Sequence, residues 1–139
     1  MNNKPTHREL GGQLREARRI LAEEPGKVIV IDPYKWDGEW ARLARYLGLR
    51  REQVALIGDR LVLVRDCLEE VAPDHYIWHG HRRFCNRPGY GAVELWEFRW
   101  ISTKWESKGM YVKFGFKRGN LCFLSFHPDE PERIVSKGR

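Results

Sequence analysis

Long apolar runs are missing from this sequence. The longest, Val28–Ile31 and Leu61–Val64, are far shorter than the roughly 20 residues that a membrane-spanning helix needs. The opening stretch MNNKPTHREL also lacks the apolar core of a secretory signal. We therefore expect a cytoplasmic protein that does not enter a membrane.

Cysteine and the small polar residues are scarce as well. The three cysteines, Cys67, Cys85 and Cys122, are odd in number and form no CxxC pair, which is typical of reduced thiols rather than of disulfide-stapled secreted domains. Only two Gln and two Thr accompany a charged fraction of 32%. Few thermolabile amides and many charges are one route to heat resistance, although GC-rich codons produce the same usage.

The residues that are present suffice for one folded domain. Of the 139 residues, 42% are hydrophobic, which excludes wholesale disorder. We expect a single monomeric domain over residues 1–128, with residues 1–6 flexible. Residues 129–139 are polar and interrupted by proline, so we expect them to form a disordered tail.

The first half of the chain has mainly helical patterns. Thr6 can cap a helix whose apolar residues recur at helical spacing, and a second helix is expected over 37–48, ending at Gly48. Between them, residues 27–31 (KVIVI) predict a buried strand. Residues 54–65 predict two short strands around Gly58-Asp59, followed by a short helix near 66–72.

The second half has the pattern of a sheet. Segments rich in β-branched and aromatic residues predict four strands, at 75–78, 93–102, 110–116 and 121–126. Residues 117–120 (KRGN) predict a hairpin between the last two. The expected fold class is therefore α+β, with N-terminal helices and short strands followed by a C-terminal antiparallel sheet.

Positive charge and aromatic residues are concentrated in one segment. Residues 76–128 hold 9 Lys and Arg against 3 Asp and Glu, and 13 of the 17 aromatics, whereas residues 1–75 carry no net charge. Local positive potential attracts acidic partners. Within this segment, the Gly- and Pro-containing stretch 79–91 predicts a contact loop. The candidate partner-binding residues are Arg82, Arg83, Phe84, Arg87, Tyr90 and Trp105. The alternative is a solvated basic loop that keeps an aromatic sheet soluble.

Two weaker patterns leave catalysis or metal binding open. His75, His79, His81 and Cys85 could supply metal ligands, although no carboxylate accompanies them. Asp74, Glu106 and Lys108 match the text of a Mg²⁺-dependent nuclease motif, although Glu106 falls in an expected turn. Because neither pattern is specific, we expect no enzyme activity, cofactor or metal.

Phe114-Gly115-Phe116 is the last motif with two interpretations. Such aromatics stack bases on the sheet of an RNA-recognition motif, but the flanking residues here do not match that motif. The other interpretation is two core phenylalanines and a close backbone approach at Gly115.

The chain as a whole is similar to one family of regulators. With 17 Arg against 8 Lys, one expected domain and a polar tail, it resembles the small Thermus-bacteriophage proteins that bind host RNA polymerase. The resemblance covers length and composition and assigns no residue. It implies binding to the β-flap and the σ factor, inhibition of initiation, and antitermination. A metal-dependent nuclease, or a small nucleic-acid-binding or anti-defence protein, is the alternative.

Overall fold

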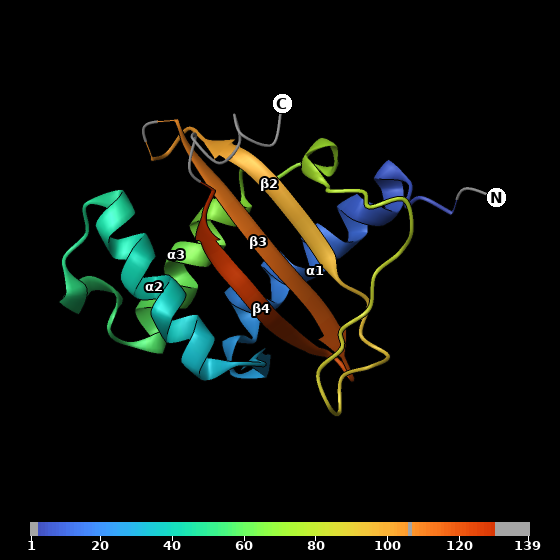
Figure 1. The fold of residues 1–139 in the computed structure, drawn as a ribbon, viewed down its shortest axis with the longest axis horizontal. Helices are drawn as coiled ribbons and strands as arrows, with labels where there is room; N and C mark the ends of the chain where they lie inside the picture. Colours follow the sequence, from blue (N-terminus) through green and yellow to red (C-terminus); the bar gives the residue numbers. More distant parts are fainter. Residues whose placement is uncertain (1–2, 106, 130–139) are drawn as a thin grey trace.

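The computed structural model describes residues 3–105 and 107–129. Within them the chain forms three helices and a mixed four-stranded sheet, which confirms the predicted α+β class (Figure 1). In chain order the elements are α1 (His7–Glu23), β1 (Val28–Val30), α2 (Pro33–Leu47), α3 (Ile57–Leu68), β2 (Trp96–Ser102), β3 (Lys108–Lys117) and β4 (Asn120–Pro128). Short 3-10 turns are η1 (Pro25–Lys27), η2 (Arg51–Val54) and η3 (Pro73–His75).

The first two helices follow their capping residues. The Thr6 Oγ1 accepts a hydrogen bond from the Glu9 N–H at 3.1 Å and starts α1, as predicted. Helix α2 begins earlier than residue 37, because Asp32 caps it through the Lys35 N–H at 3.1 Å and Pro33 takes its first position. It ends at Gly48, whose φ of 70° is left-handed.

The predicted pair of short strands over residues 54–65 is wrong. This segment belongs to η2 and α3, and Gly58 lies in the first turn of α3. The side chains of Val64, Cys67 and Leu68 recur at helical spacing and are buried. The expected helix at 66–72 is the last turn of the same α3.

Helix α1 anchors the end of α3. The Arg18 guanidinium donates to the Leu68 and Val71 carbonyls at 2.9 and 2.6 Å, and so ties α1 to the end of α3 and to the residues that follow it.

The sheet has the strand order β1-β4-β3-β2. Strands β2, β3 and β4 form the predicted antiparallel meander, whereas β1 from the first half adds to β4 in parallel. Arg118 and Gly119, with φ of 51° and 81°, form the two-residue turn of the predicted 117–120 hairpin. The strand expected at 75–78 is wrong: residues 73–75 form η3, and Tyr76 contributes a single bridge to Phe98.

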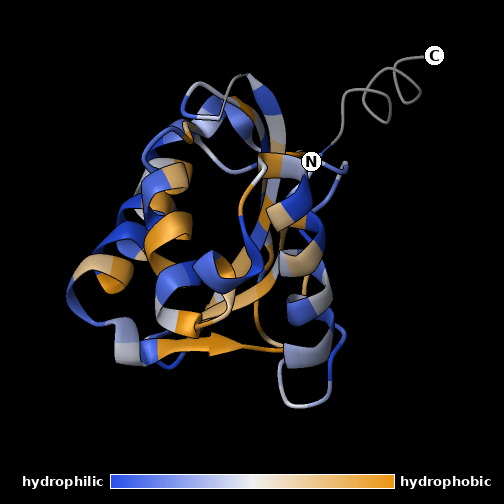
Figure 2. Cartoon of the chain, turned by 90° about the vertical axis from the view of Figure 1, so that its left-hand side faces the viewer, coloured by the Kyte–Doolittle hydropathy of each residue, from blue (hydrophilic) through white to orange (hydrophobic). Residues whose placement is uncertain are grey.

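The two faces of the sheet differ in cover. Helix α1 crosses behind the sheet and α2 lies beside β4, and none of the helices in the described residues covers the face toward the viewer (Figure 1). The covered face carries the core, where Phe98, Phe114, Phe123 and Phe126 are fully buried. Helices show mixed hydrophobic and hydrophilic residues, whereas β1 is hydrophobic throughout (Figure 2). The face of the sheet toward the viewer in Figure 1, opposite the covered face, is called the open face below.

A β-bulge in β4 sets which side chains reach the open face. Lys113 pairs with Ser125 and Phe114 with Phe123, so Leu124 is an extra residue between them. Leu124 packs in a small cluster with Cys85, a cluster separate from the main core, while Phe123 faces the core. The bulge therefore places Leu124 and Ser125 together on the open face.

Two further expectations concern the membrane and the chain ends. Across the described residues, none of the helices has the length and apolarity required to traverse a bilayer. Residues 130–139 of the expected tail lie outside the described residues. Asp129 is described and buried, and its N–H donates to the Gly109 carbonyl at 2.9 Å.

Candidate functional site

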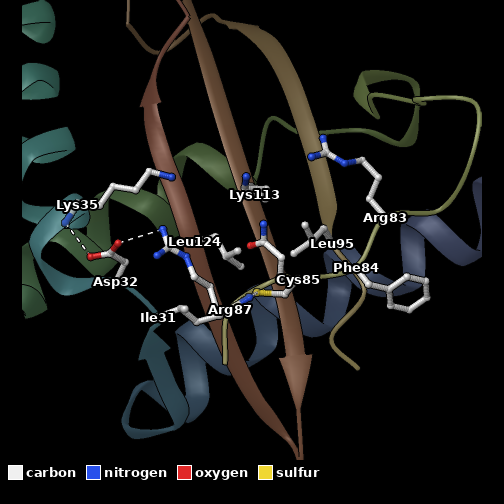
Figure 3. A pocket seen from close by; sticks show the side chains of 11 residues that line it. Ile31, Asp32, Lys35, Arg83, Phe84, Cys85, Arg87, Leu95, Lys113 and Leu124 are labelled. Carbon is white, nitrogen blue, oxygen red and sulfur yellow. Dashed lines mark hydrogen bonds and ion pairs between the residues drawn. The ribbon is translucent and has the colours of Figure 1, made fainter. Parts of the chain in front are cut away.

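A basic pocket lies on the open face, where β3 and β4 meet the start of α2 and the loop before β2 (Figure 3). Its volume is about 140 Å³. Apolar side chains from three segments line one part of it, namely Cys85, Leu95 and Leu124. Its four cationic residues are Lys35, Arg83, Arg87 and Lys113. Asp32 is the one acidic residue that lines it among the described residues.

Lys113 is the least satisfied of these cations. It is half-buried on β3, and no hydrogen bond or ion pair joins its ammonium to any residue that the structure describes. Burial lowers the pKa of Lys113, Glu97 partly offsets this, and the charges of Lys35 and Arg83 lower it further. A desolvated cation without a partner is costly, so an anion in the pocket would stabilise it.

Two of the other cations, Lys35 and Arg87, are each held by one neighbouring side chain. The Lys35 Nζ donates to the Ser125 Oγ at 2.9 Å, which ties α2 to β4. The Arg87 guanidinium lies 3.1 Å from Asp32 Oδ2, and its side chain remains about half exposed. Because Asp32 also caps α2, its charge is shared between the helix end and Arg87.

Glu97 organises the edge of the pocket. Its carboxylate is almost fully buried on β2 and accepts from Tyr111 Oη at 2.5 Å and from Arg83 Nη1 at 2.9 Å. His79 Nε2 lies 3.2 Å from the same carboxylate. Burial raises the pKa of the Tyr111 phenol, and the bond to Glu97 raises it further. This network fixes where the Arg83 guanidinium sits.

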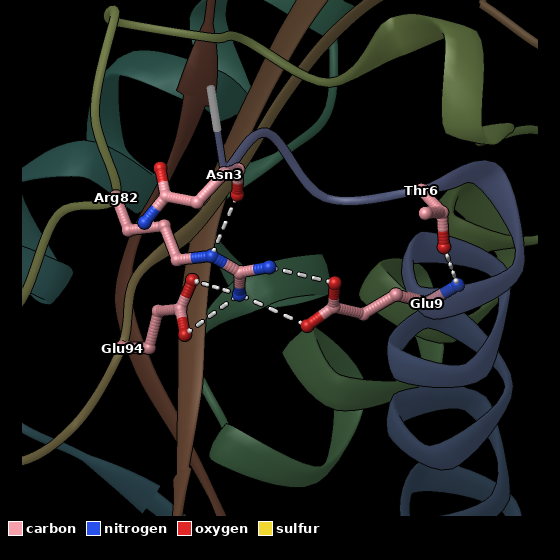
Figure 4. Close-up of polar contacts among 5 residues, drawn as sticks. All are labelled: Asn3, Thr6, Glu9, Arg82 and Glu94. Carbon is pink, nitrogen blue, oxygen red and sulfur yellow. Dashed lines mark hydrogen bonds and ion pairs between the residues drawn. The ribbon is translucent and has the colours of Figure 1, made fainter. Parts of the chain in front are cut away.

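Arg82, the neighbour of Arg83, forms a separate cluster of polar contacts with Asn3, Glu9 and Glu94 (Figure 4). Its Nη1 and Nη2 contact both Glu9 carboxylate oxygens at 2.9 and 2.8 Å, and Nη1 also reaches Glu94 at 3.0 Å. Its Nε donates to the Asn3 carbonyl at 3.0 Å. Arg82 therefore joins the start of α1 to the loop before β2 and lies outside the pocket lining.

We expect the Arg82→Ala variant to lose stability. Removing the guanidinium leaves Glu9 and Glu94 beside each other without their shared cation, which should cost about 1–2 kcal/mol of unfolding free energy. Urea denaturation of the variant and the parent protein measures this loss. A variant of unchanged stability would show that the clamp contributes nothing.

The structure brings together three of the six predicted contact residues. Arg83, Phe84 and Arg87 line the pocket. Tyr90 packs against the Cys85 cluster, with the Lys117 Nζ 4.7 Å from its ring centre. Trp105 packs against the main core instead of forming an exposed anchor.

Three charged residues of the pocket lie outside the predicted contact segment 79–91. Lys35 and Asp32 come from the start of α2, and Lys113 comes from β3. The alternation of β3 does place Lys113 with Tyr111 on the face opposite Val112. That signal marks Lys113 as a residue of the open face, but it does not show which loop and helix meet it there.

The candidate metal ligands of the sequence do not form a metal-binding group among the described residues. Within residues 3–105 and 107–129, no three His, Cys, Asp or Glu side chains are grouped so that they could hold a metal ion. His75 Nδ1 accepts from the Ala72 N–H at 3.0 Å, and Cys85 lies in the apolar part of the pocket.

The described nuclease-pattern residues have separate surroundings. Asp74 is exposed and lies 3.1 Å from His7 Nε2 beside the start of α1. Lys108 begins β3, with its Nζ 5.6 Å from the Tyr46 ring centre. Glu106 lies outside the described residues. No described contact joins Asp74 to Lys108.

The Phe114-Gly115-Phe116 motif serves packing. Phe114 is fully buried and its ring stacks on Phe98, 5.9 Å between centres, so it presents no face to a base. A Cβ at Gly115 would lie 2.6 Å from the Glu94 carbonyl oxygen. The core interpretation, with a close backbone approach at Gly115, is therefore confirmed.

Comparisons with known proteins found no relative. No protein-family model matches the chain, and searches of the curated proteins and of the solved structures returned no match. The resemblance to phage regulators of RNA polymerase therefore stays a prediction. The chemistry of the basic pocket is the ground on which a function can be proposed.

Proposed function

We propose that this protein binds nucleic acid by seating a backbone phosphate in the basic pocket of the open face. The observation that carries the proposal is Lys113, a half-buried cation without a described partner among three further cations. A phosphodiester supplies a fixed negative charge and acceptor oxygens, which is what this set of donors lacks. This proposal takes up the nucleic-acid alternative that the charge distribution left open.

The dimensions and charges of the pocket suit a phosphate group. Its volume of about 140 Å³ holds several water molecules, and Arg83 and Arg87 bring forked donors to its rim. Glu97 holds Arg83 in place before a ligand arrives. Binding then costs less conformational entropy, because the Arg83 side chain is already ordered.

The test is a titration of a fluorescently labelled oligonucleotide, followed by anisotropy, at several salt concentrations. We expect log K to fall linearly with log salt, with a slope of roughly −0.7 to −0.9 for each phosphate neutralised. No binding at about 50 mM salt and about 100 μM protein, where even non-specific binders associate, would overturn the proposal.

Asp32→Asn should raise the affinity for nucleic acid. The amide oxygen can still cap α2 through the Lys35 N–H, but the charge that competes for Arg87 is gone. We expect about a fivefold gain, since one charge pair near a surface is worth roughly 1 kcal/mol. The same anisotropy titration measures it.

Asp74→Asn is the matched control for Asp32→Asn. It changes the net charge equally but lies beside His7, outside the pocket lining. If both variants gained affinity equally, the gain would reflect total charge and not the pocket.

A second candidate function is binding to RNA polymerase, as the family resemblance implies. The observation that favours it is the exposed apolar side chains of α3 and its N-cap, where Leu56, Ile57 and Val62 are 68%, 52% and 48% exposed. Val62 also lines a shallow groove with Leu49 and Trp105. Exposed apolar side chains that border a groove are typical of protein interfaces.

A pull-down separates the two candidates. Tagged protein is incubated with bacterial lysate, with and without nuclease, and bound proteins are identified by mass spectrometry. A polymerase subunit that survives nuclease and is lost with Val62→Asp supports the second candidate. Recovery of no polymerase subunit removes it and leaves the nucleic-acid proposal in place.

A further inference from the structure

One exposed aromatic side chain lines the basic pocket, and a second lies on the helix that borders it. Phe84 lines it and is 53% exposed, and Tyr34 is 91% exposed on the first turn of α2. Tyr34 follows Asp32 and precedes Lys35, which both line the pocket. An isolated exposed aromatic is ordinary, but Phe84 lines a pocket together with four cations, which suits a ligand with both charge and flat apolar surface.

The exposure of Phe84 follows from how its backbone is held. Phe84 forms a bridge to Glu94, and on either side the Cys85 N–H donates to Val93 and the Leu95 N–H to Arg83, both at 2.9 Å. In such an extended ladder successive side chains alternate. Because Cys85 turns into the apolar cluster, Phe84 must point outward, as Figure 3 shows. The ring is therefore presented on a paired backbone.

We infer that the nucleic acid bound here is single-stranded, with a base stacked on Phe84. The inference rests on the proposed function, because the pocket that Phe84 lines takes the phosphate. A single strand exposes the faces of its bases, whereas a duplex buries them in its own stack. Arg83 and Arg87, on either side of Phe84 in the chain, bring cations to the backbone of the same strand.

The recessed position of Lys113 supports the same choice. Lys113 is half-buried and lines a cavity that residues 83–87 and the start of α2 border. A flexible single strand can bend one phosphate into such a cavity. The stiff backbone of a duplex cannot do so without deformation, which costs free energy.

The experiment compares a labelled oligo-dT 12-mer with a duplex of the same length under identical salt. We expect the single strand to bind about tenfold tighter, and Phe84→Ala to weaken it by about tenfold, as the loss of one stacked base does. The salt slope should not change with Phe84→Ala, since no charge is removed. Phe84→Trp should restore the affinity, whereas Phe84→Leu should not, because only the former offers an aromatic face.

Ile101→Ala is the matched control. Ile101 is also 53% exposed and lies on β2, outside the pocket lining. It should leave both affinities unchanged. Equal affinity for both ligands together with a silent Phe84→Ala would overturn the single-strand inference while leaving the proposed function standing. Failure of both ligands to bind would instead remove the proposed function.

Discussion

Alanine at position 115 should destabilise the fold by about 2–3 kcal/mol, the upper range for an overpacked site. A Cβ there would lie 2.4 Å from Val93 Cγ1 and 2.6 Å from the Glu94 carbonyl oxygen. Real Cβ atoms do not approach other atoms so closely, and the carbonyl belongs to backbone that cannot rotate away. The segment before β2 would have to lift from β3.

Gly38→Ala is the control for this substitution. Gly38 is exposed within α2, and a Cβ there would meet nothing within 4 Å. Alanine is the better helix former by up to about 1 kcal/mol, so the same chemical change should stabilise the protein. Urea denaturation of the two variants measures both effects. A neutral Gly115→Ala would contradict the close approach of β3 to the 93–94 backbone.

Lys113→Met should weaken nucleic-acid binding by about tenfold or more and lower the salt slope by about one phosphate contact. The variant removes the cation that forms no hydrogen bond or ion pair with a described residue, and it retains an apolar stem. We expect the free energy of unfolding to stay equal or to rise, because Glu97 only partly offsets the desolvation of the half-buried Lys113. A loss of binding without a loss of stability is the signature of a ligand-binding residue.

Lys104→Met removes an equal charge in a different setting. Lys104 is paired with Glu69 at 3.3 Å and does not line the pocket. Its affinity for nucleic acid should stay close to that of the parent protein. If Lys113→Met instead lowered stability and left binding unchanged, Lys113 would be a structural residue and the pocket would not hold a phosphate. Anisotropy titrations and urea denaturation of both variants supply the comparison.

Local patterns predicted most elements of the fold, and α3 shows where they fail. Helix α1, the β3–β4 hairpin and the end of α2 are encoded by neighbouring residues, namely Thr6, Arg118-Gly119 and Gly48. The residues of α3 are rich in Val, Leu and Ile, which suit either a strand or a buried helix. Contact with α1, including the Arg18 bonds to the end of α3, decides the matter, and that contact is not visible in the local sequence.

The candidate site was predictable only in part, for an electrostatic reason. The excess of positive charge in residues 76–128 is real, but several of its cations pair with carboxylates from elsewhere, such as Arg82 with Glu9 and Arg87 with Asp32. Counting charges along the chain cannot show these pairs. Lys113 differs from Arg82 because of its tertiary surroundings and not because of its residue type.

The bulge in β4 changes which side chains of that strand face the helices. Up to Phe123 the odd-numbered side chains face the helices, and from Phe126 onward the even-numbered ones do. One inserted residue, Leu124, thus reverses the parity of the strand. If the same sequence ran through without the bulge, regular alternation would turn Ser125 toward the helices and Phe126 toward solvent. The hydrophobic pattern that builds the core and the polar pattern that holds Lys35 are therefore kept in phase by the position of a single residue.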